Sequence, residues 1–373
     1  MTLNLSRTLG AVGLGAMLIA LPTGAMAQDF DLDALIEAAK AEAPITVYAS
    51  TGKIQTVAEA FTAKYGIEAT GTKVSSSAQA ELMIREYQSG NIVGDLIVSS
   101  DAAATLAQII PEGMVTSWLP PDLADTIPAD SQDPLVVYRD PAVWSFNNSV
   151  YDECPVDNMW ALTGEDWHRK VAMPDPLNKP AIADWFNQLE THWDDKMAAA
   201  YEAFAGEPLD TSEQSATASW VQALAENQPL LTDSDSAVAD AVGAPDQEDP
   251  FMGILSSAKY RDVVDGGLTM EICEGIEPFV GLANPAYALI SAKTDSPNAA
   301  KLFAHFMMTE EGIEPMTVDG KISGNNAVPP HPDEASGVGA VADRLTPNDA
   351  STGMDDFDSR QDWQDFWRVH YSR

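Results

Sequence analysis

Hydroxyl side chains follow three short apolar segments early in the chain, and a helix-forming run comes next each time. The segments cover 45–49, 69–74 and 95–98, and the helices are predicted from about residue 55, over 78–88 and over 102–109. The candidate binding residues at these junctions are Ser50, Thr51, Gly52, Lys53, Ser76, Ser77 and Ser99. Parallel strands share one edge at their carboxyl ends, and backbone N–H groups at helix N-termini favour an anion. The pattern therefore predicts a binding edge for a negatively charged group.

The same hydroxyls have a second interpretation, because serine before a helix is most often a cap. One cluster alone favours the cap, whereas three clusters aligned on one edge favour a binding site. The cluster around Ser99 is the one most expected to cap only, since Asp101 beside it opposes an anion.

The second half of the chain repeats the order of strand, polar cluster and helix. Predicted strands over 170–173 and 229–231 precede two polar clusters, whose candidate residues are Asp175, Asn178, Asp233, Ser234 and Asp235. We expect these side chains to hydrogen-bond sugar hydroxyls or to pair an ammonium group at the other end of the ligand.

One further run, 253–261, concentrates Ser256, Lys259 and Arg261 in an otherwise acidic chain. The run either faces the anion or supports a hinge, and the sequence leaves both readings open.

Elements that could position these residues follow from the hydrophobic pattern. Ile54, Val57 and Phe61 recur at helical spacing ahead of Gly66, which predicts a helix over 55–65. Further helices are predicted over 181–192, 197–204, 219–225, 237–242 and 298–308, and strand-like segments over 136–138, 142–146, 279–282 and 288–290. Near the C-terminus, an apolar stripe of Trp363, Phe366, Trp367 and His370 predicts a docking helix.

Charge and leader sequence limit the function classes. The chain carries 57 acidic residues against 20 Lys and Arg, a formal net charge of −37, which argues against nucleic acid and anionic lipid as partners. Residues 1–27 have the pattern of a secretory signal peptide, with Arg7, an apolar stretch over 9–21 and an Ala25-Met26-Ala27 cleavage site. We therefore expect a soluble protein outside the inner membrane.

Only two cysteines occur, Cys154 and Cys273. In an oxidising compartment an isolated pair predicts a disulfide, with two reduced buried thiols as the alternative.

Enzyme signatures are missing from the sequence. It has no Gly-x-Ser-x-Gly nucleophile elbow, and its five histidines lack metal-ligand spacing. A secreted enzyme is the rival class, and we predict neither a catalytic residue nor a cofactor.

Several motifs in sequence order resemble the periplasmic solute-binding proteins of ABC importers, of the ferric-ion-binding type. They are Ile45-Thr46-Val47-Tyr48-Ala49-Ser50, Phe61-Thr62-Ala63-Lys64-Tyr65-Gly66, Gly94-Asp95-Leu96-Ile97-Val98-Ser99-Ser100, Trp144-Ser145-Phe146-Asn147-Asn148, Val171-Ala172-Met173-Pro174-Asp175-Pro176 and Ser296-Pro297-Asn298-Ala299-Ala300-Lys301-Leu302-Phe303. Their order and spacing, more than any single motif, are similar to that family.

The resemblance implies an α/β fold of two lobes, each a mainly parallel sheet flanked by helices, joined by crossing strands. We place lobe 1 at 28–140 and 283–330, lobe 2 at 141–282, and a C-terminal tail with its docking helix at 331–373. It also implies a periplasmic monomer that delivers its ligand to an inner-membrane ABC permease, although supply of a chemoreceptor stays open.

The ligand class is a separate question. Ferric members of the family usually present neighbouring tyrosines, but no two of the nine tyrosines here are adjacent, leaving Tyr260 and Tyr287 as candidate ligands. The hydroxyls and helix N-termini fit a phosphate ester or phosphonate better. We therefore expect a small anion in the interlobe cleft, with ferric iron as the alternative and no metal site.

Overall fold

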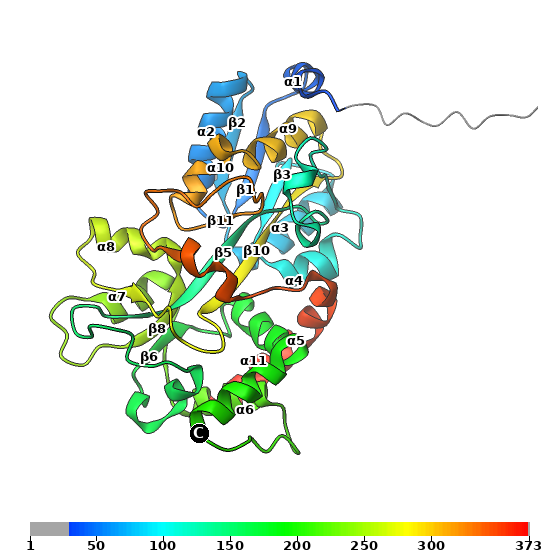
Figure 1. Cartoon of the computed structure of the whole chain (residues 1–373). Coiled ribbons are helices and arrows are strands. Elements are labelled where there is room, and N and C mark those ends of the chain that lie inside the picture. Colours follow the sequence, from blue (N-terminus) through cyan, green and yellow to red (C-terminus); the bar gives the residue numbers. More distant parts are fainter. Residues whose placement is uncertain (1–29, 372–373) are drawn as a thin grey trace, which may run out of the picture. The chain divides into compact units, whose positions relative to one another are not determined.

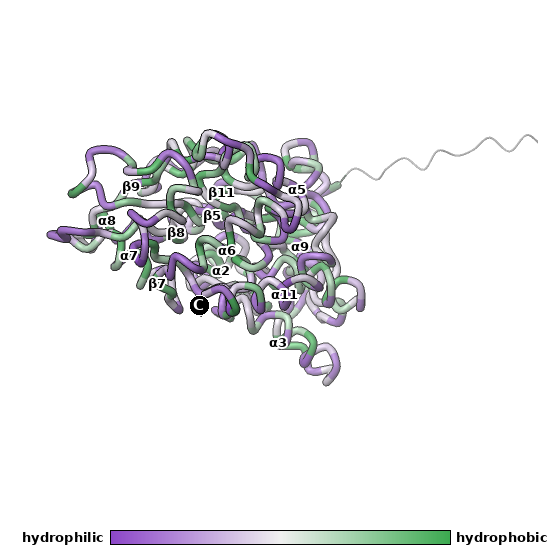
Figure 2. The backbone as a smooth tube through the Cα atoms, turned by 90° about the horizontal axis from the view of Figure 1, so that it is seen from below, coloured by the Kyte–Doolittle hydropathy of each residue, from purple (hydrophilic) through white to green (hydrophobic). Residues whose placement is uncertain are grey.

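The computed structural model describes residues 30–371, so the predicted signal peptide lies outside the described residues. The fold belongs to the unit Leu32–Arg373. Among the described residues, no helix is both long and apolar enough to cross a membrane. Figure 2 shows hydrophilic and hydrophobic residues interspersed along the backbone of this unit.

The strands of the described chain form one twelve-stranded sheet. Its main path runs β2 (Ala69–Lys73), β1 (Ile45–Ala49), β3 (Leu96–Ser99), β10 (Gly281–Ser291), β5 (Val136–Phe146), β8 (Met252–Ser256), β6 (Val171–Pro174) and β7 (Leu230–Thr232). Short strands β4 (Val115–Ser117), β9 (Glu271–Ile272), β11 (Ile322–Ser323) and β12 (Leu345–Thr346) pair beside this path. β1 is parallel to β2 and β3, and β6 is parallel to β7 and β8. The predicted mixed α/β class is confirmed.

Two long antiparallel strands, β5 and β10, lie between the two parallel sets (Figure 1). The sequence predicts each as two short strands, because Pro141 and Pro285 interrupt the apolar pattern. The structure keeps each strand continuous, with Pro141 opposite Ala283 and Pro285 opposite Arg139 in the pairing register. A proline removes one N–H donor, and the remaining pairs hold the ladder together.

The helices in chain order are α1 (Leu32–Lys40), α2 (Lys53–Tyr65), α3 (Ser76–Ser89), α4 (Ala102–Ala104), α5 (Pro180–Ala205), α6 (Ala216–Glu226), α7 (Asp235–Gly243), α8 (Arg261–Asp265), α9 (Pro297–Met307), α10 (Glu310–Thr317) and α11 (Gly353–Tyr371). Helix α2 buries Ile54, Val57 and Phe61 and ends at Gly66, whose φ of 71° is left-handed, as the sequence predicts. The predicted helix over 102–109 is the short α4 followed by a π-helical turn, Thr105–Ile109.

Helix α5 corrects another expectation, because the two helices predicted over 181–192 and 197–204 are one continuous helix. Asp194, which lies between the two predicted helices, continues the helix and turns its carboxylate to the start of α6. It accepts hydrogen bonds from the backbone N–H of Ala216 at 3.2 Å and of Thr217 at 2.7 Å. The acid therefore caps a neighbouring helix rather than ending its own.

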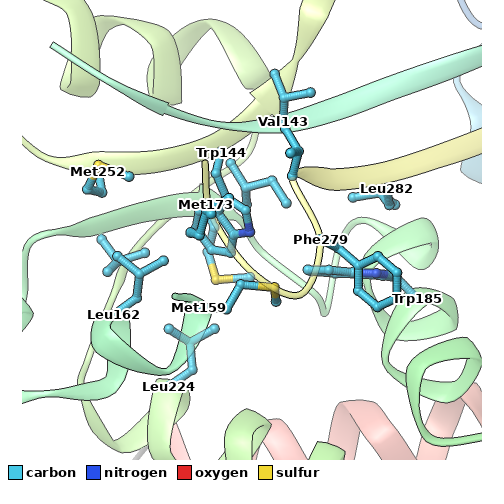
Figure 3. Packing of buried hydrophobic residues seen from close by; sticks show 14 of the residues in the cluster. Val143, Trp144, Met159, Leu162, Met173, Trp185, Leu224, Met252, Phe279 and Leu282 are labelled. Carbon is cyan, nitrogen blue, oxygen red and sulfur yellow. The ribbon is translucent and has the colours of Figure 1, made fainter. Parts of the chain in front are cut away.

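Hydrophobic cores form on both sides of the crossing strands. One core packs β1, β3, α2 and α9 around buried residues such as Phe61 and Phe303. A second surrounds β6, β8, α5 and α6, and Figure 3 shows its Trp144, Met173 and Trp185 converging. Helix α11 buries Trp363 and Trp367 in this second core.

The predicted disulfide is confirmed. Cys154 and Cys273 are bonded, with their Cα atoms 5.2 Å apart and a sequence separation of 119. Cys273 is fully buried in the second core and Cys154 packs against it.

Candidate functional site

A cavity of about 630 Å³ opens where the carboxyl ends of both parallel strand sets meet. Its first wall follows β1, β2 and β3, and consists of Ser50, Thr51, Gly52, Lys53, Lys73, Ser75, Ser76 and Ser100. Its second wall follows β6, β7 and β8, and includes Lys179, Ala181, Ser234, Asp235, Ser236, Ser256, Lys259 and Arg261. The floor comes from β5, β10 and the segment before β11, with Asp140, Asn284, Asp319 and Lys321. A volume of this size suits a small organic molecule.

The first wall presents helix N-termini without side-chain caps. Neither Gly52, which precedes α2, nor Ser75, which precedes α3, makes a side-chain capping bond. Thr51 Oγ1 only accepts a 3.3 Å bond from the N–H of Lys53, at the entrance to α2. In α2 the first three N–H groups are bonded locally: that of Lys53 to Thr51 Oγ1, that of Ile54 to the Thr51 carbonyl at 3.5 Å and that of Gln55 to the Gly52 carbonyl at 3.1 Å. The N–H groups of Ser76 and Ser77, which begin α3, make no such bond within the described residues, so the start of α3 offers donors to the cavity. At α3 the geometry therefore does not show the hydroxyls as caps, whereas at α2 Thr51 accepts a bond from the first helical N–H.

The third junction behaves differently. Ser99 is buried, and its hydroxyl lies 2.7 Å from that of Thr105, away from the cavity. Asp101 caps α4 by accepting a bond from the N–H of Ala104 at 3.1 Å. Ser100 lines the cavity instead, with its hydroxyl 2.8 Å from that of Ser50.

The second wall brings two more helix N-termini to the cavity. Helix α5 begins after Lys179 with no side-chain cap, whereas α7 is capped by Ser234, which accepts from the N–H of Ala237 at 3.3 Å. Ser256 donates to Asp140 Oδ1 at 3.1 Å and accepts a 3.4 Å bond from the N–H of Ala258. Four helices, α2, α3, α5 and α7, thus begin at one cavity.

Several of the predicted second-half residues lie outside the cavity lining. Asp175 is used locally, accepting bonds from Leu177 N–H at 3.0 Å and from the Asn178 amide at 3.1 Å. Asn178 and Asp233 are exposed, and their side chains are 3.5 Å apart. Of the sequence-derived acids, Asp235 alone lines the second wall.

Two other candidates are also outside the lining. Ser77 is exposed beside Ser75, at 3.5 Å between hydroxyl oxygens. Tyr287 is 1% exposed on β10, and burial raises the pKa of its phenol.

Cationic side chains dominate the charge of the cavity. Six line it, Lys53, Lys73, Lys179, Lys259, Arg261 and Lys321, against three acids, Asp140, Asp235 and Asp319. The whole chain has only 20 such cations against 57 acids. The cavity is therefore a local positive region in a strongly negative protein.

Most of these lysines escape prediction from the sequence. Lys259 and Arg261 belong to the basic run over 253–261, and both do face the cavity. Lys179 could have been found because it directly precedes helix α5, much as Lys53 is the first residue of α2. Lys73 and Lys321 carry no such signal, since only tertiary packing brings β2 and the segment before β11 to the same opening.

Tyrosines and metal-binding groups are not gathered at the cavity. No tyrosine of the described residues lines it. Tyr260 is 3% exposed with its hydroxyl 2.7 Å from that of Ser145, and burial raises its pKa. The part of the chain that the structure describes contains no group of three His, Cys, Asp or Glu residues arranged to hold a metal ion.

Comparison with known families decides the class of the protein. The family model of bacterial extracellular solute-binding proteins matches residues 45–320, which include every cavity-lining residue except Lys321. The chain belongs to this family. As a solute-binding protein it captures a small molecule and is not an enzyme.

Solved structures of similar fold carry different solutes. Iron-bound HitA from Pseudomonas aeruginosa matches this solute-binding protein with a TM-score of 0.67 at 14% identity, covering 88% of this chain and 99% of that one. AfuA from Actinobacillus pleuropneumoniae, with fructose-6-phosphate bound, matches at 0.64 and 16% identity, with the same two coverages. The Trichodesmium protein IdiA (FutA), in complex with iron and citrate, matches at 0.60 and 15% identity, covering 88% and 99%. These similarities show the two-lobe binding-protein fold. No protein with curated annotation matches the sequence.

Proposed function

We propose that this protein is the periplasmic binding component of an ABC importer and that it captures a phosphate ester or phosphonate in the cavity. The observation that carries the proposal is the excess of cations over acids, six against three, in a chain whose net charge is −37. Random placement of so few cations does not concentrate them at one opening. An anion with two or three acceptor oxygens matches such a surface.

The first wall supplies the proposed head-group site. The start of α2 and the start of α3 bring Ser50, Thr51, Gly52 and Ser76 to one side of the cavity, with Lys53 beside them. Backbone N–H groups, hydroxyls and an ammonium group are the donors that a phosphate or phosphonate oxygen accepts from. The lack of a side-chain cap on α3 leaves the N–H groups of Ser76 and Ser77 available, whereas the first N–H groups of α2 are bonded to Thr51 and Gly52.

Ferric iron is the second proposal, because HitA contains iron. Fe³⁺ is a hard cation, which phenolate oxygens suit. In this chain the two tyrosines considered as ligands, Tyr260 and Tyr287, are almost fully buried, and burial raises the pKa of both phenols. The cationic lining also repels a free metal ion. These observations favour the phosphate ester or phosphonate.

A thermal-shift panel separates the two proposals. We expect phosphate esters or phosphonates to raise the melting temperature and ferric salts to leave it unchanged. A ligand at a hundred times its Kd adds about 2.7 kcal/mol to the free energy of unfolding, which such an assay detects. Ferric citrate belongs in the panel with citrate alone as its control. A visible iron–tyrosinate absorption band on adding Fe³⁺, with no response to any phosphorus compound, contradicts the proposal.

A further inference from the structure

The second wall of the cavity is basic, as one of the two readings of the run 253–261 allows, and it contains fewer acids than the sequence predicts there. The polar residues expected there to meet hydroxyls or an ammonium group include three acids, and two of these, Asp175 and Asp233, lie outside the lining. The side chains that line the second wall include Lys179, Lys259 and Arg261. Cations therefore line both walls. The end of the ligand that lies away from the phosphorus group would also meet positive charge.

Every acid that lines the cavity is already engaged with a cation. Asp319 is buried, pairs with Arg261, and lies 3.7 Å from Lys53 Nζ. Asp140 Oδ1 lies 2.6 Å from Lys321 Nζ. Asp235 accepts a bond from the N–H of Ser256 at 3.1 Å and lies 3.9 Å from Lys179 Nζ.

Two lining cations remain after this pairing, Lys73 on the first wall and Lys259 on the second. Neither forms a salt bridge with a carboxylate in the described part of the chain. Lys73 is exposed and ends β2, while Lys259 is half-buried and follows β8. A half-buried ammonium group without a partner is costly, because burial disfavours its charged form.

A ligand anion beside Lys259 would lower the free-energy cost of keeping its ammonium group charged in these surroundings. Burial lowers its pKa first, and the neighbouring guanidinium of Arg261 lowers it further, while Asp235, Asp262 and Asp319 act in the opposite direction. Since Asp235 and Asp319 are shared with other cations, an added negative charge from solution has a favourable place beside Lys259.

We propose that the ligand carries two anionic groups, a phosphate or phosphonate held by the first wall and a second anion, a carboxylate or another phosphate, held by Lys259 on the second wall. The inference rests on the proposed function and specifies the ligand class within it. The cavity lining includes both walls, and the volume of about 630 Å³ is large enough for a small organic molecule between them.

Matched ligand pairs test the inference. Glycerol 3-phosphate and 3-phosphoglycerate differ only in a hydroxymethyl against a carboxylate at the far end, and glucitol 6-phosphate and 6-phosphogluconate provide an open-chain six-carbon pair with the same difference. In any pair that binds, calorimetry should find the carboxylated member at least tenfold tighter. Lys259→Gln should reduce the affinity ratio of the carboxylated to the uncarboxylated ligand to threefold or less. The affinity for the uncarboxylated ligand should change by less than threefold.

Lys170→Gln is the control variant. Lys170 precedes β6 on the same half of the protein, pairs with Asp249 at 2.8 Å and does not line the cavity. Lys170→Gln removes one positive charge, as Lys259→Gln does, but outside the cavity. It should therefore leave the tenfold tighter binding of the carboxylated ligand unchanged. The melting temperature of Lys170→Gln without ligand should be within about 2 °C of the parent, as for a surface change. That of Lys259→Gln should not fall below the parent's by more than this, because the variant removes a half-buried charge that has no carboxylate partner.

The outcomes separate the inference from the proposed function. Equal affinity within each pair, or an advantage that survives Lys259→Gln, overturns the two-anion inference and leaves a phosphate-binding function standing. Absence of binding by both members of both pairs and by inorganic phosphate, together with no response in the wider phosphate and phosphonate panel, overturns the proposed function and the inference with it.

Discussion

At the scale of residues, two adjacent serines offer a sharp test of the head-group site. Ser76 lines the cavity at the start of α3, whereas Ser77 is exposed and does not belong to the lining. We expect Ser76→Ala to weaken binding of a phosphate ester by about 1–3 kcal/mol, because a ligand acceptor loses its donor. Ser77→Ala should change binding by less than about 0.5 kcal/mol, as for a surface substitution. Titration calorimetry measures both.

The two variants also have a stability readout. The Ser76 hydroxyl makes no capping bond, so Ser76→Ala should leave the free energy of unfolding without ligand within about 1 kcal/mol of the parent. Equal binding by the two variants would place the head group away from α3.

Some residues of the candidate site can be predicted from the sequence and others cannot. The hydroxyls after β1 and β2 are predictable because strand, hydroxyl and helix follow each other directly in the chain. Lys73 and Lys321 are not predictable in this way, since their approach depends on β2 pairing with β1 and on β11 pairing with β5. Ser99 was proposed in place of Ser100, because the sequence does not specify which of two adjacent hydroxyls faces inward.

At the scale of elements, the disulfide clamps two distant segments of the second core. Cys154 follows β5 and Cys273 follows β9, at a sequence separation of 119. On the chain-entropy model, closing a loop of this length stabilises the fold by about 5 kcal/mol. We expect the Cys154→Ser, Cys273→Ser double variant to lose a few kcal/mol, about 2–5, in denaturant titration. Ligand affinity of the folded variant should be unchanged, because neither cysteine lines the cavity.

A thiol assay accompanies that measurement. Titration of the parent under denaturing, non-reducing conditions should find almost no free thiol. Two reactive thiols per chain would show that the bond is absent from the purified protein.

Helix α11 connects elements from both sides of the crossing strands through one arginine. Arg360 donates to Asp184 on α5, with both bonds at 2.8 Å, and to Asp101 at the start of α4, the shorter at 2.6 Å. One guanidinium therefore serves two buried carboxylates. Burial raises the pKa of Asp184 to about 7, with Asp101 and Asp356 adding to the rise and Arg360 opposing it.

This raised pKa sets the direction of a pH effect. Between its unfolded value of 3.8 and about 7, Asp184 binds more protons in the folded state than in the unfolded state. Its contribution to the free energy of unfolding is therefore fully present below the unfolded value and is lost as pH rises towards 7. The loss is at most about 1.4 kcal/mol for each pH step of one across that range.

Comparison with Asp184→Asn isolates the contribution. We expect the stability of the parent minus that of the variant to fall between pH 4 and pH 7 in denaturant titrations. A difference that is flat or rises with pH would show that Arg360 keeps Asp184 ionised throughout.

Element boundaries show where sequence reasoning succeeds and fails. β1 is predicted at its observed bounds, and α2 within two residues, because apolar periodicity and Gly66 mark them locally. The sequence pattern divides β5 and β10 at Pro141 and Pro285, and α5 near Asp194. In all three cases a tertiary partner maintains an element that local pattern would end.

At the scale of the whole molecule, the two-lobe α/β fold was predictable from the order of its motifs, and the family match confirms the class. The solute was not predictable to the same degree. We propose that its recognition depends on six cations from five parts of the chain, of which the sequence marks only the run with Lys259 and Arg261 as basic. The central claim is that one anionic solute contacts both walls of the cavity.

A crystal structure grown with a phosphorus-containing solute selected by the thermal-shift panel tests that claim most directly. We expect density for the phosphorus group at the starts of α2 and α3, within hydrogen-bond distance of Thr51 and Ser76. The rest of the solute should extend to the second wall at Lys259. An anomalous peak at the iron edge with protein oxygen ligands, or solute density outside this cavity, would contradict the account.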